Sequence, residues 1–291
     1  MSGSGHAKFN IKSLGQLKEI IERLGLSIPV SDDLSVLSKE LTIAGHSVPN
    51  RFAVHPMEGF DATPEGVPGW LTFRRYTRYA HGGFGLIWVE ATAVLKEARS
   101  NPRQLWLNRD SAPAFKKLVE TVRSTAKETF GHNIVLIIQL THSGRYSNPT
   151  GAPKPLIAHH SPVLDPTHKL PADYPLVTDE YLNSLHGAYL EAARLAAEAG
   201  FDGIDIKSCH RYLVSELLAS FTREGRYGGS FENRTRLLLE TLTKIKQSVP
   251  GVFITTRMNA YDAIAYPYGF GVDRNDEKKP DLSEPLALVR K

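Results

Sequence analysis

Two hydrophobic patterns alternate along this chain. Nearly continuous apolar runs, which are typical of strands covered on both faces of a parallel sheet, occupy residues 51–56, 84–91, 133–140, 203–208 and 252–258. Stretches with helical periodicity stand between or after them, at residues 111–130, 179–200 and 231–248. This alternation predicts an α/β fold in which crossover helices connect parallel strands.

Cap and stop residues set the expected helix ends. Ser111 is expected to cap the first of these helices, which ends before Gly131, and Gly200 is expected to stop the second. The final residues, SEPLALVRK, predict a further helix with Ser283 as its N-cap. Residues 148–178 form a long proline-rich loop, which we interpret as a lid.

The composition is that of a globular enzyme. The 291 residues are 41% hydrophobic and 23% charged, and no apolar run is long enough to cross a bilayer. The first twelve residues lack the apolar segment of a secretory signal, so we expect a loose tail and a cytoplasmic protein. We expect residues 1–45 to hold this tail and a lead-in helix, and residues 46–291 to form one barrel domain.

Charge and cysteine content narrow the chemistry. Cys209 is the single cysteine, which excludes an internal disulfide or a multi-cysteine metal or iron–sulfur site, and we predict no metal site. Redox chemistry in this chain would therefore need an organic cofactor. The net charge of +4 comes from scattered basic residues, so no nucleic-acid partner is expected, although a mildly basic pocket would suit an anionic cofactor.

Residues with polar side chains or usable backbone groups follow or end the predicted strands, where α/β barrels place their chemistry. They are Pro56, Met57, Glu58, Glu90, Ala91, Gln139, His142, Arg145, Lys207, His210, Arg211, Tyr212 and Arg257. Amide, guanidinium and backbone groups dominate this set and suit a planar heterocycle. They do not suggest glycoside hydrolysis, which needs two opposed carboxylates.

Several of these residues also have a structural interpretation. Cys209 is expected to be a small packing residue, and Glu90 a buried carboxylate bonded to backbone N–H groups. His142 and Arg145 either shape the loop after the third strand or contact substrate. The segment YGGSFENR at 227–234 is expected to be structural, with Ser230 as a helix cap.

Five segments carry a resemblance to a known family. They are NRFAVHPM at 50–57, GGFGLIWVEATAV at 82–94, QLTHSGR at 139–145, GFDGIDIKSCHRYL at 200–213 and YGGSFENR at 227–234. With Arg257 they span about residues 45–260, in the order and spacing of the Old Yellow Enzyme family. The chain resembles that family of FMN-dependent ene-reductases, also called NADH:flavin oxidoreductases.

The resemblance implies an eight-stranded (β/α)8 barrel with FMN across its C-terminal mouth. The backbone of Pro56 and Met57 would border the flavin ring, Ala91 would meet its polar edge, and Gln139 would bond its pyrimidine side. Arg257 would stabilise negative charge on reduced flavin. NADH or NADPH would supply the hydride and would visit the flavin pocket, because no glycine-rich dinucleotide fingerprint follows a predicted strand.

The resemblance also implies catalytic roles at the fourth strand. Lys207 and His210 would bind the carbonyl of a small-molecule substrate, an activated alkene, and Tyr212 would supply a proton. Lys207 departs from the family's histidine, and Glu58 replaces the small hydroxyl residue of many relatives, so the substrate preference is left open.

Length is the larger departure. The sequence contains about five of the eight strands that the barrel requires and none of the later strands and loops that bind the flavin phosphate, so we expect a C-terminally incomplete barrel. Two alternatives stay open: a non-catalytic remnant unable to retain FMN, and a hydrolase using Glu90 and Asp205. Homo-oligomerisation also stays open.

Overall fold

The structure, a computed structural model that describes residues 10–291, is built around a five-stranded parallel sheet. The strands lie in chain order and are β3 (Ala53–Val54), β4 (Leu86–Ala93), β5 (Val135–Thr141), β6 (Gly203–Ser208) and β7 (Phe253–Met258). Every neighbouring pair is parallel. The predicted parallel α/β architecture is therefore confirmed, with five strands in this sheet.

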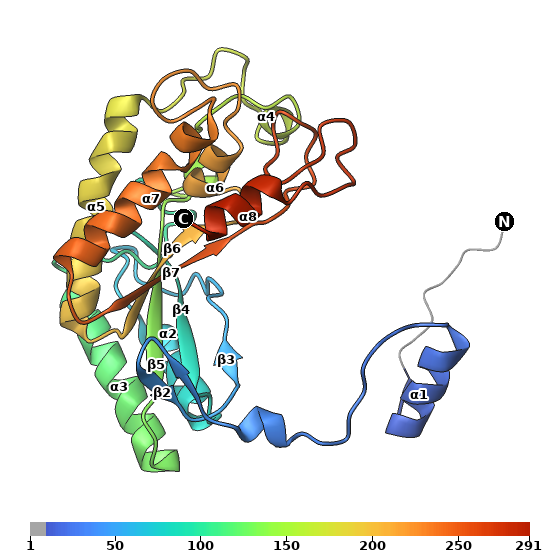
Figure 1. Cartoon of the computed structure of the whole chain (residues 1–291). Helices are drawn as coiled ribbons and strands as arrows, with labels where there is room; N and C mark the ends of the chain where they lie inside the picture. The colour runs from blue at the N-terminus through green and yellow to red at the C-terminus, as the bar shows by residue number, and fades with distance from the viewer. Residues whose placement is uncertain (1–9) are drawn as a thin grey trace.

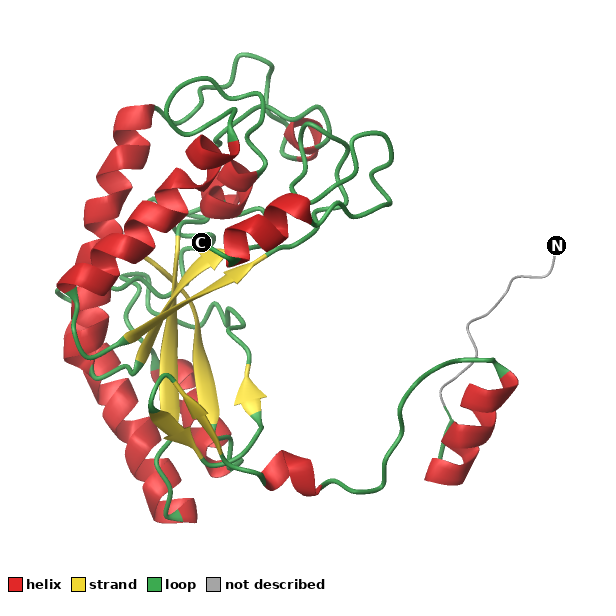
Figure 2. Cartoon of the chain, viewed as in Figure 1, coloured by secondary structure: helices red, strands yellow, loops and turns green. Residues whose placement is uncertain are grey.

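Crossover helices cover the outer face of this sheet (Figure 1). The longest are α2 (Trp70–His81), α3 (Ala112–Phe130), α5 (Asp179–Ala199) and α7 (Phe231–Ser248). The shorter helices are α1 (Leu14–Arg23), η1 (Ser35–Ser38), η2 (Gly144–Tyr146), α4 (Leu164–Thr167), α6 (Leu213–Leu218) and α8 (Ser283–Val289). The sheet curves without closing in this view, which gives the main body an open, C-shaped outline (Figure 2).

The strands alternate between two buried environments although their sequences read as continuous apolar runs. On the outer face, side chains such as Leu136, Ile138, Ile204 and Ile206 belong to the main core under the helices. Because successive side chains point to opposite faces of a strand, their neighbours, such as Gln139, point to the inner face. The period of two therefore decides which residues can reach the barrel interior.

An antiparallel hairpin packs against inward-facing residues near the beginning of the strands. It consists of β1 (Leu41–Ile43) and β2 (His46–Val48). Val48 forms a second apolar cluster with residues from β4 and β5, and with partly buried neighbours from β7. The hairpin was not predicted from the sequence. Because the hairpin lies near the beginning of the strands, the polar end of the barrel interior is at the carboxyl ends of the strands.

Most helix boundaries agree with the sequence prediction. Gly131 and Gly200 follow α3 and α5 in the left-handed region, with φ of 72° and 94°, where glycine is favoured. Ser230 accepts a hydrogen bond from the Asn233 N–H and caps α7. Ser111 occupies the cap position of α3, but its hydroxyl donates to the Trp106 carbonyl instead of capping the helix.

Two expected elements need correction. The strand expected at 51–56 is reduced to Ala53–Val54, because β3 pairs only with β4 among the described strands and Pro56 has no N–H to donate. Ser283 is not the N-cap of α8 but its first helical residue, and Leu282 takes the cap position. The Ser283 backbone and hydroxyl both donate to Asp281, which therefore forms the turn before the helix.

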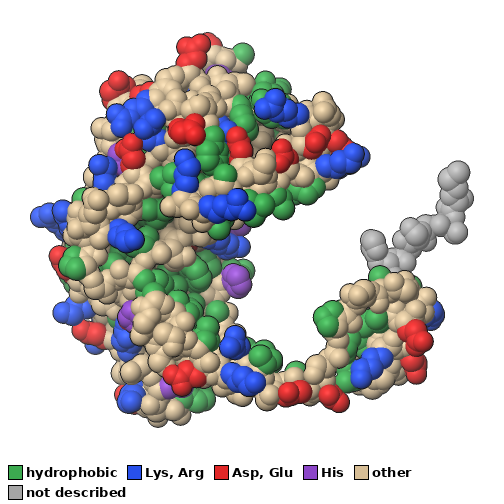
Figure 3. Space-filling view, viewed as in Figure 1, with side chains coloured by type: hydrophobic (Ala, Val, Ile, Leu, Met, Phe, Trp, Pro, Cys, Tyr) green, Lys and Arg blue, Asp and Glu red, His purple; other side chains and the backbone are tan. Residues whose placement is uncertain are grey.

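The N-terminal arm stands apart from the main body in Figures 1 and 3. Helix α1 has no buried residue, and the segment after it exposes large hydrophobic side chains, including Leu26 and Leu34. The expected loose tail covers residues 1–12, of which 1–9 lie outside the described residues. Within residues 10–291, no helix has the length and apolarity needed to cross a membrane.

Candidate active site

Three neighbouring strands place polar side chains at the same level of the barrel interior. In the register of β5, β6 and β7, Gln139 lies opposite Asp205, and Lys207 lies opposite Arg257. Asp205 and Lys207 are two residues apart on β6 and therefore share its inner face. The sheet thus gathers an amide, a carboxyl group, an ammonium and a guanidinium at its carboxyl end.

Gln139 and Asp205 form a fully buried pair. The Gln139 Nε2 donates to Asp205 Oδ2 over 2.5 Å, while Gln139 Oε1 and Asp205 Oδ1 have no hydrogen-bond partner in the described structure. Burial raises the pKa of Asp205 to about 6, although the bond from Gln139 opposes the shift. The pair therefore contains two buried acceptor atoms without a partner in the described chain, which is an uncommon arrangement in a folded protein.

Lys207 and Tyr212 converge on one carboxylate. Glu58 Oε1 accepts hydrogen bonds from Lys207 Nζ and from the Tyr212 hydroxyl, each over 2.9 Å, and Glu58 Oε2 accepts one from the Ser100 hydroxyl over 2.7 Å. Lys207 Nζ also lies 3.6 Å from the centre of the Tyr212 ring, a cation–π contact. The two family departures, Lys207 and Glu58, are thus direct partners.

Burial keeps Tyr212 protonated. Desolvation raises the pKa of its hydroxyl, and the neighbouring Glu58 carboxylate raises it further. A phenol held neutral in this way retains a proton to donate across the whole physiological range. This state is the one that a proton donor requires.

His210 stands at the edge of the same site and is exposed. It lines an open pocket of about 520 Å³ with Tyr146, Arg211, Tyr212 and Asn259. His210 and Arg211 both have left-handed backbones, with φ of 61° and 57°, a strained conformation for residues other than glycine. Burial and nearby cations, Lys207 first, lower the pKa of His210, so the ring is neutral at pH 7.

Arg257 is half-buried at the end of β7. Across residues 10–291 its guanidinium has no hydrogen bond or ion pair within the chain. An unpaired guanidinium in a partly desolvated site is free to bind an anion or a polar ring edge. This property matches the role that the family resemblance assigns to Arg257.

The expected backbone contacts come from the loop after β3 and from β4. Pro56 is buried, whereas the Met57 side chain is 73% exposed. The register of β4 and β5 shifts between Val89 and Thr92, so Ala91 lies in a β-bulge, a feature common beside active sites. Its carbonyl accepts from Gln104 Nε2 over 2.9 Å.

Glu90 has a structural role. Its carboxylate accepts from Arg75 Nη2 over 2.6 Å and from the Gly59 N–H over 2.7 Å, so its charge is balanced within the fold. Asp205, the other acid of the hydrolase alternative, is bonded to Gln139. Glu90 and Asp205 are thus not a pair of free, opposed carboxylates, and the geometry does not support that alternative.

His142 and Arg145 shape the loops and have internal partners. His142 Nδ1 accepts from the Gly144 N–H, so the ring proton sits on Nε2, 2.7 Å from the Tyr181 hydroxyl. Burial lowers the pKa of His142 to about 3. Arg145 is fully buried and donates to Glu216 over 2.9 Å and to Asp165 over 2.5 Å.

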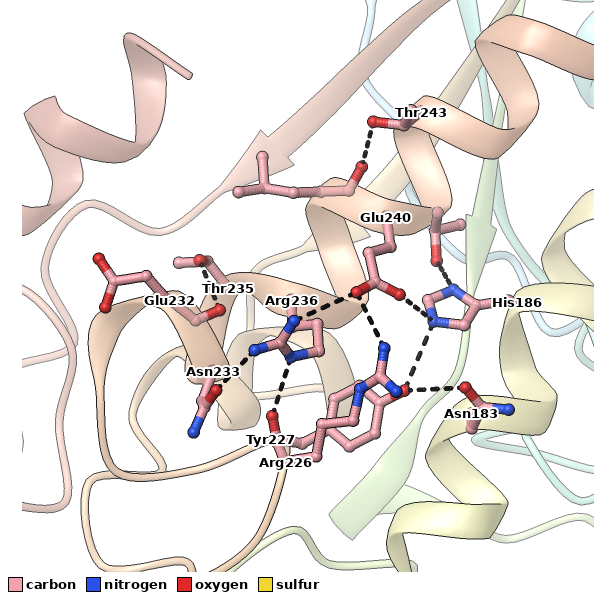
Figure 4. A network of polar contacts seen from close by, with 12 residues as sticks. Asn183, His186, Arg226, Tyr227, Glu232, Asn233, Thr235, Arg236, Glu240 and Thr243 are labelled. Carbon is pink, nitrogen blue, oxygen red and sulfur yellow. Dashed lines mark hydrogen bonds and ion pairs between the residues drawn. The ribbon is translucent and has the colours of Figure 1, made fainter.

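The YGGSFENR segment also has internal partners, which supports its structural interpretation (Figure 4). The Tyr227 hydroxyl lies 3.5 Å from Asn183 Oδ1 and from His186 Nε2, both on α5. The Arg234 Nε donates to the Gly229 carbonyl over 3.0 Å. Gly228 is required because an added Cβ would lie 2.3 Å from the Arg223 carbonyl oxygen. These contacts fix the loop between α6 and α7.

Cys209 is buried below the site, and burial raises the pKa of its thiol to about 11. A thiol in this state is a poor nucleophile. The geometry therefore favours the packing interpretation. Across the described chain, no cluster of histidine, cysteine and acidic side chains is suited to hold a metal ion.

Sequence reasoning missed three residues that organise the site: Arg75, Ser100 and Gln104. Arg75 lies on α2, which was not predicted because it follows Pro68-Gly69 without a conventional side-chain cap. A signal was present in the spacing of its buried residues Thr72, Tyr76 and Ala80. A second signal was that the parallel strands β3 and β4 need a crossover connection between them.

Comparison with known proteins identifies the family. The model of the NADH:flavin oxidoreductase / NADH oxidase family matches residues 37–270. The chain belongs to this family. It is 31% identical over 239 residues to the NADPH dehydrogenase of Clostridium acetobutylicum, covering 81% of this chain and 66% of that relative. The chain thus spans just under two thirds of that relative's length.

Solved structures show the same fold. The 2-naphthoyl-CoA reductase structure aligns with a TM-score of 0.71 at 23% identity, covering 88% of this chain and 38% of that one. Old Yellow Enzyme from Pichia sp. AKU4542 aligns with a TM-score of 0.63 at 24% identity, covering 79% and 61%. These structures show a fold of the TIM-barrel type, and the family match together with the Clostridium relative confirms the resemblance to the Old Yellow Enzyme family.

Family membership implies FMN as the cofactor and a reduced nicotinamide nucleotide as the reductant. The residues at the mouth fit such a group. Gln139 Oε1 is a buried acceptor without a partner in the described chain, and Arg257 is a donor without one. A flavin ring, whose pyrimidine side carries both donors and acceptors, would satisfy this pair of orphaned groups.

Proposed function

We propose that this chain is the FMN-binding, substrate-reducing part of an oxidoreductase that uses NAD(P)H to reduce an alkene conjugated to a carbonyl. FMN would accept hydride from the nicotinamide and pass it to the alkene. The observation that carries the proposal is the convergence of a neutral, buried Tyr212 with polar groups of three strands at one barrel end. Family membership supports the redox chemistry.

Each residue has a distinct task in this proposal. Gln139 and Arg257 would bind the polar edge of the flavin, and the backbone at Pro56, Met57 and Ala91 would border its ring. His210 would donate a hydrogen bond to the substrate carbonyl from the pocket that it shares with Tyr212. Tyr212 would protonate the carbon beside that carbonyl, since its hydroxyl stays protonated.

For Lys207 we propose a different role from the one that its position suggested. Its ammonium is held by Glu58 and packed on Tyr212, so it would support Tyr212 instead of bonding the carbonyl. Both members of the ion pair are nearly buried, with side-chain exposures of 4% and 10%. The local charge is therefore close to neutral, which suits an uncharged enone.

The test separates the two half-reactions under anaerobic conditions. With FMN bound, NAD(P)H should bleach the flavin absorbance, and a cyclic enone should restore it. Tyr212→Phe should leave bleaching unchanged and slow the restoration about 100-fold or more, the usual size of a general-acid contribution. Restoration at the unaltered rate in Tyr212→Phe would reject the proton-donor role. A protein that never binds FMN would favour the non-catalytic alternative.

A further inference from the structure

Glu58 makes a set of contacts that no part of the proposed reaction has yet used. One oxygen accepts from both Lys207 Nζ and the Tyr212 hydroxyl, and the other accepts from Ser100. Lys207 in turn lies on the face of the Tyr212 ring. The Glu58 carboxylate therefore joins three segments, which are the loop after β3, the loop after β4 and the end of β6.

The charged groups in this arrangement depend on one another. The side chains of Lys207 and Glu58 are 4% and 10% exposed, so loss of either partner would leave a nearly buried charge without compensation. Tyr212 depends on the same carboxylate, because Glu58 is the one side-chain acceptor of its hydroxyl within the described residues. Removing Glu58 therefore removes the acceptor that Lys207 Nζ and the Tyr212 hydroxyl share.

We propose that Glu58 is a positioning residue for substrate reduction, which locks Lys207 and Tyr212 into one unit and leaves His210 as the side chain that contacts the substrate carbonyl. The effect of Glu58 on catalysis rests on the proposed function, whereas the locked unit of Glu58, Lys207 and Tyr212 does not depend on it. A displacement of about 1 Å in a reacting group can cost about 100-fold in rate. Glu58 thus acts on the reaction through Tyr212.

The first test is a double-mutant cycle on the full 291-residue chain. Glu58→Gln and Lys207→Met should each lower the urea midpoint, while Glu58→Gln/Lys207→Met should recover part of the loss because it leaves no unpaired charge. Glu198→Gln is the matched control, since this glutamate is exposed and lies on the outer helix α5. Losses that simply add in the double variant would overturn the proposal.

The second test follows the ionisation of Tyr212 by near-ultraviolet absorbance, as the difference between each protein and its Tyr212→Phe counterpart. In the unaltered chain Tyr212 should stay protonated up to the pH at which the fold is lost, because burial and Glu58 both raise its pKa. Glu58→Gln removes the negative neighbour and leaves the Lys207 cation against the ring, so Tyr212 should ionise below that pH. The Glu198→Gln control should match the unaltered chain. Absence of Tyr212 ionisation in folded Glu58→Gln would overturn the proposal.

The third test separates positioning from general stability. At a temperature where all variants are folded, Glu58→Gln should lower kcat for alkene reduction about tenfold or more with little change in KM and no change in flavin bleaching by NAD(P)H. The double variant should regain stability but not kcat. Full recovery of kcat in the double variant would overturn the proposal. Absence of alkene reduction in the unaltered chain would instead reject the proposed function, while the first two tests would still decide the locked unit.

Discussion

At the scale of single residues, burial and partners decide roles that residue type leaves open. Glu90 and Glu58 are both carboxylates near strand ends, but Arg75 balances Glu90, whereas Glu58 binds Lys207 and Tyr212. The sequence identified the departures at positions 58 and 207 separately. Their pairing was not predictable, because they are far apart in the chain and meet only through the curvature of the sheet.

Asp205 provides a test of the buried pair at this scale. Its pKa is raised by burial from 3.8 to about 6, so the folded state binds the proton more tightly than the unfolded state. This contribution to stability is fully present below about pH 4 and is lost as the pH rises through about 6. The free energy of unfolding of Asp205→Asn should therefore rise relative to that of the unaltered chain between pH 4 and pH 8, by up to about 3 kcal/mol.

Urea unfolding at several pH values measures this difference. The asparagine oxygen can still accept the bond from Gln139, so the geometry of the pair is retained. If the difference in free energy of unfolding between the two proteins is constant from pH 4 to pH 8, Asp205 is ionised in the folded state over this range.

At the scale of elements, the long strands and helices could be predicted from the sequence, whereas the short elements could not. Strand β6 was expected at 203–208 and occupies Gly203–Ser208, because its residues are buried on both faces and bounded by loops. The hairpin β1–β2 was missed because each strand has three residues, too few to show a period. Helix α2 was missed because its N-cap is a glycine without a side-chain cap and only three of its residues are buried, although these three lie on one face.

The loop at 148–178 depends on one buried arginine. Arg145 bonds Asp165 within the loop, the His159 carbonyl, and Glu216 on α6. Arg145→Met would leave the buried Glu216 without its arginine partner and Asp165 with His160 alone, and breaking a buried ion pair in this way costs about 3–5 kcal/mol. We expect a lower urea midpoint and faster proteolysis within the loop.

Arg109→Met is the matched control for this prediction. Arg109 is 82% exposed and paired with Glu191 on the surface, so its loss should cost about 1 kcal/mol or less. Equal stability of the two variants would show that the Arg145 network does not anchor the loop.

At the scale of the whole molecule, the open sheet is the feature that most affects function. Strands β4–β7, whose carboxyl ends carry the polar groups, form a curved but unclosed wall (Figure 1), and the chain spans 66% of the length of its Clostridium relative. The residues proposed to contact the flavin ring are nevertheless all present, on β4, β5 and β7 and in the loop after β3. The account therefore predicts that this wall has affinity for the ring itself.

The most direct measurement is a titration of the purified 291-residue chain with FMN, followed by flavin fluorescence and by visible absorbance after desalting. The account predicts saturable one-to-one binding that Arg257→Ala weakens about tenfold or more, as expected for loss of a charge-assisted contact. Arg109→Ala, on the outer surface, should bind as the unaltered chain does. A chain that remains colourless and does not change the fluorescence of FMN would contradict the central claim.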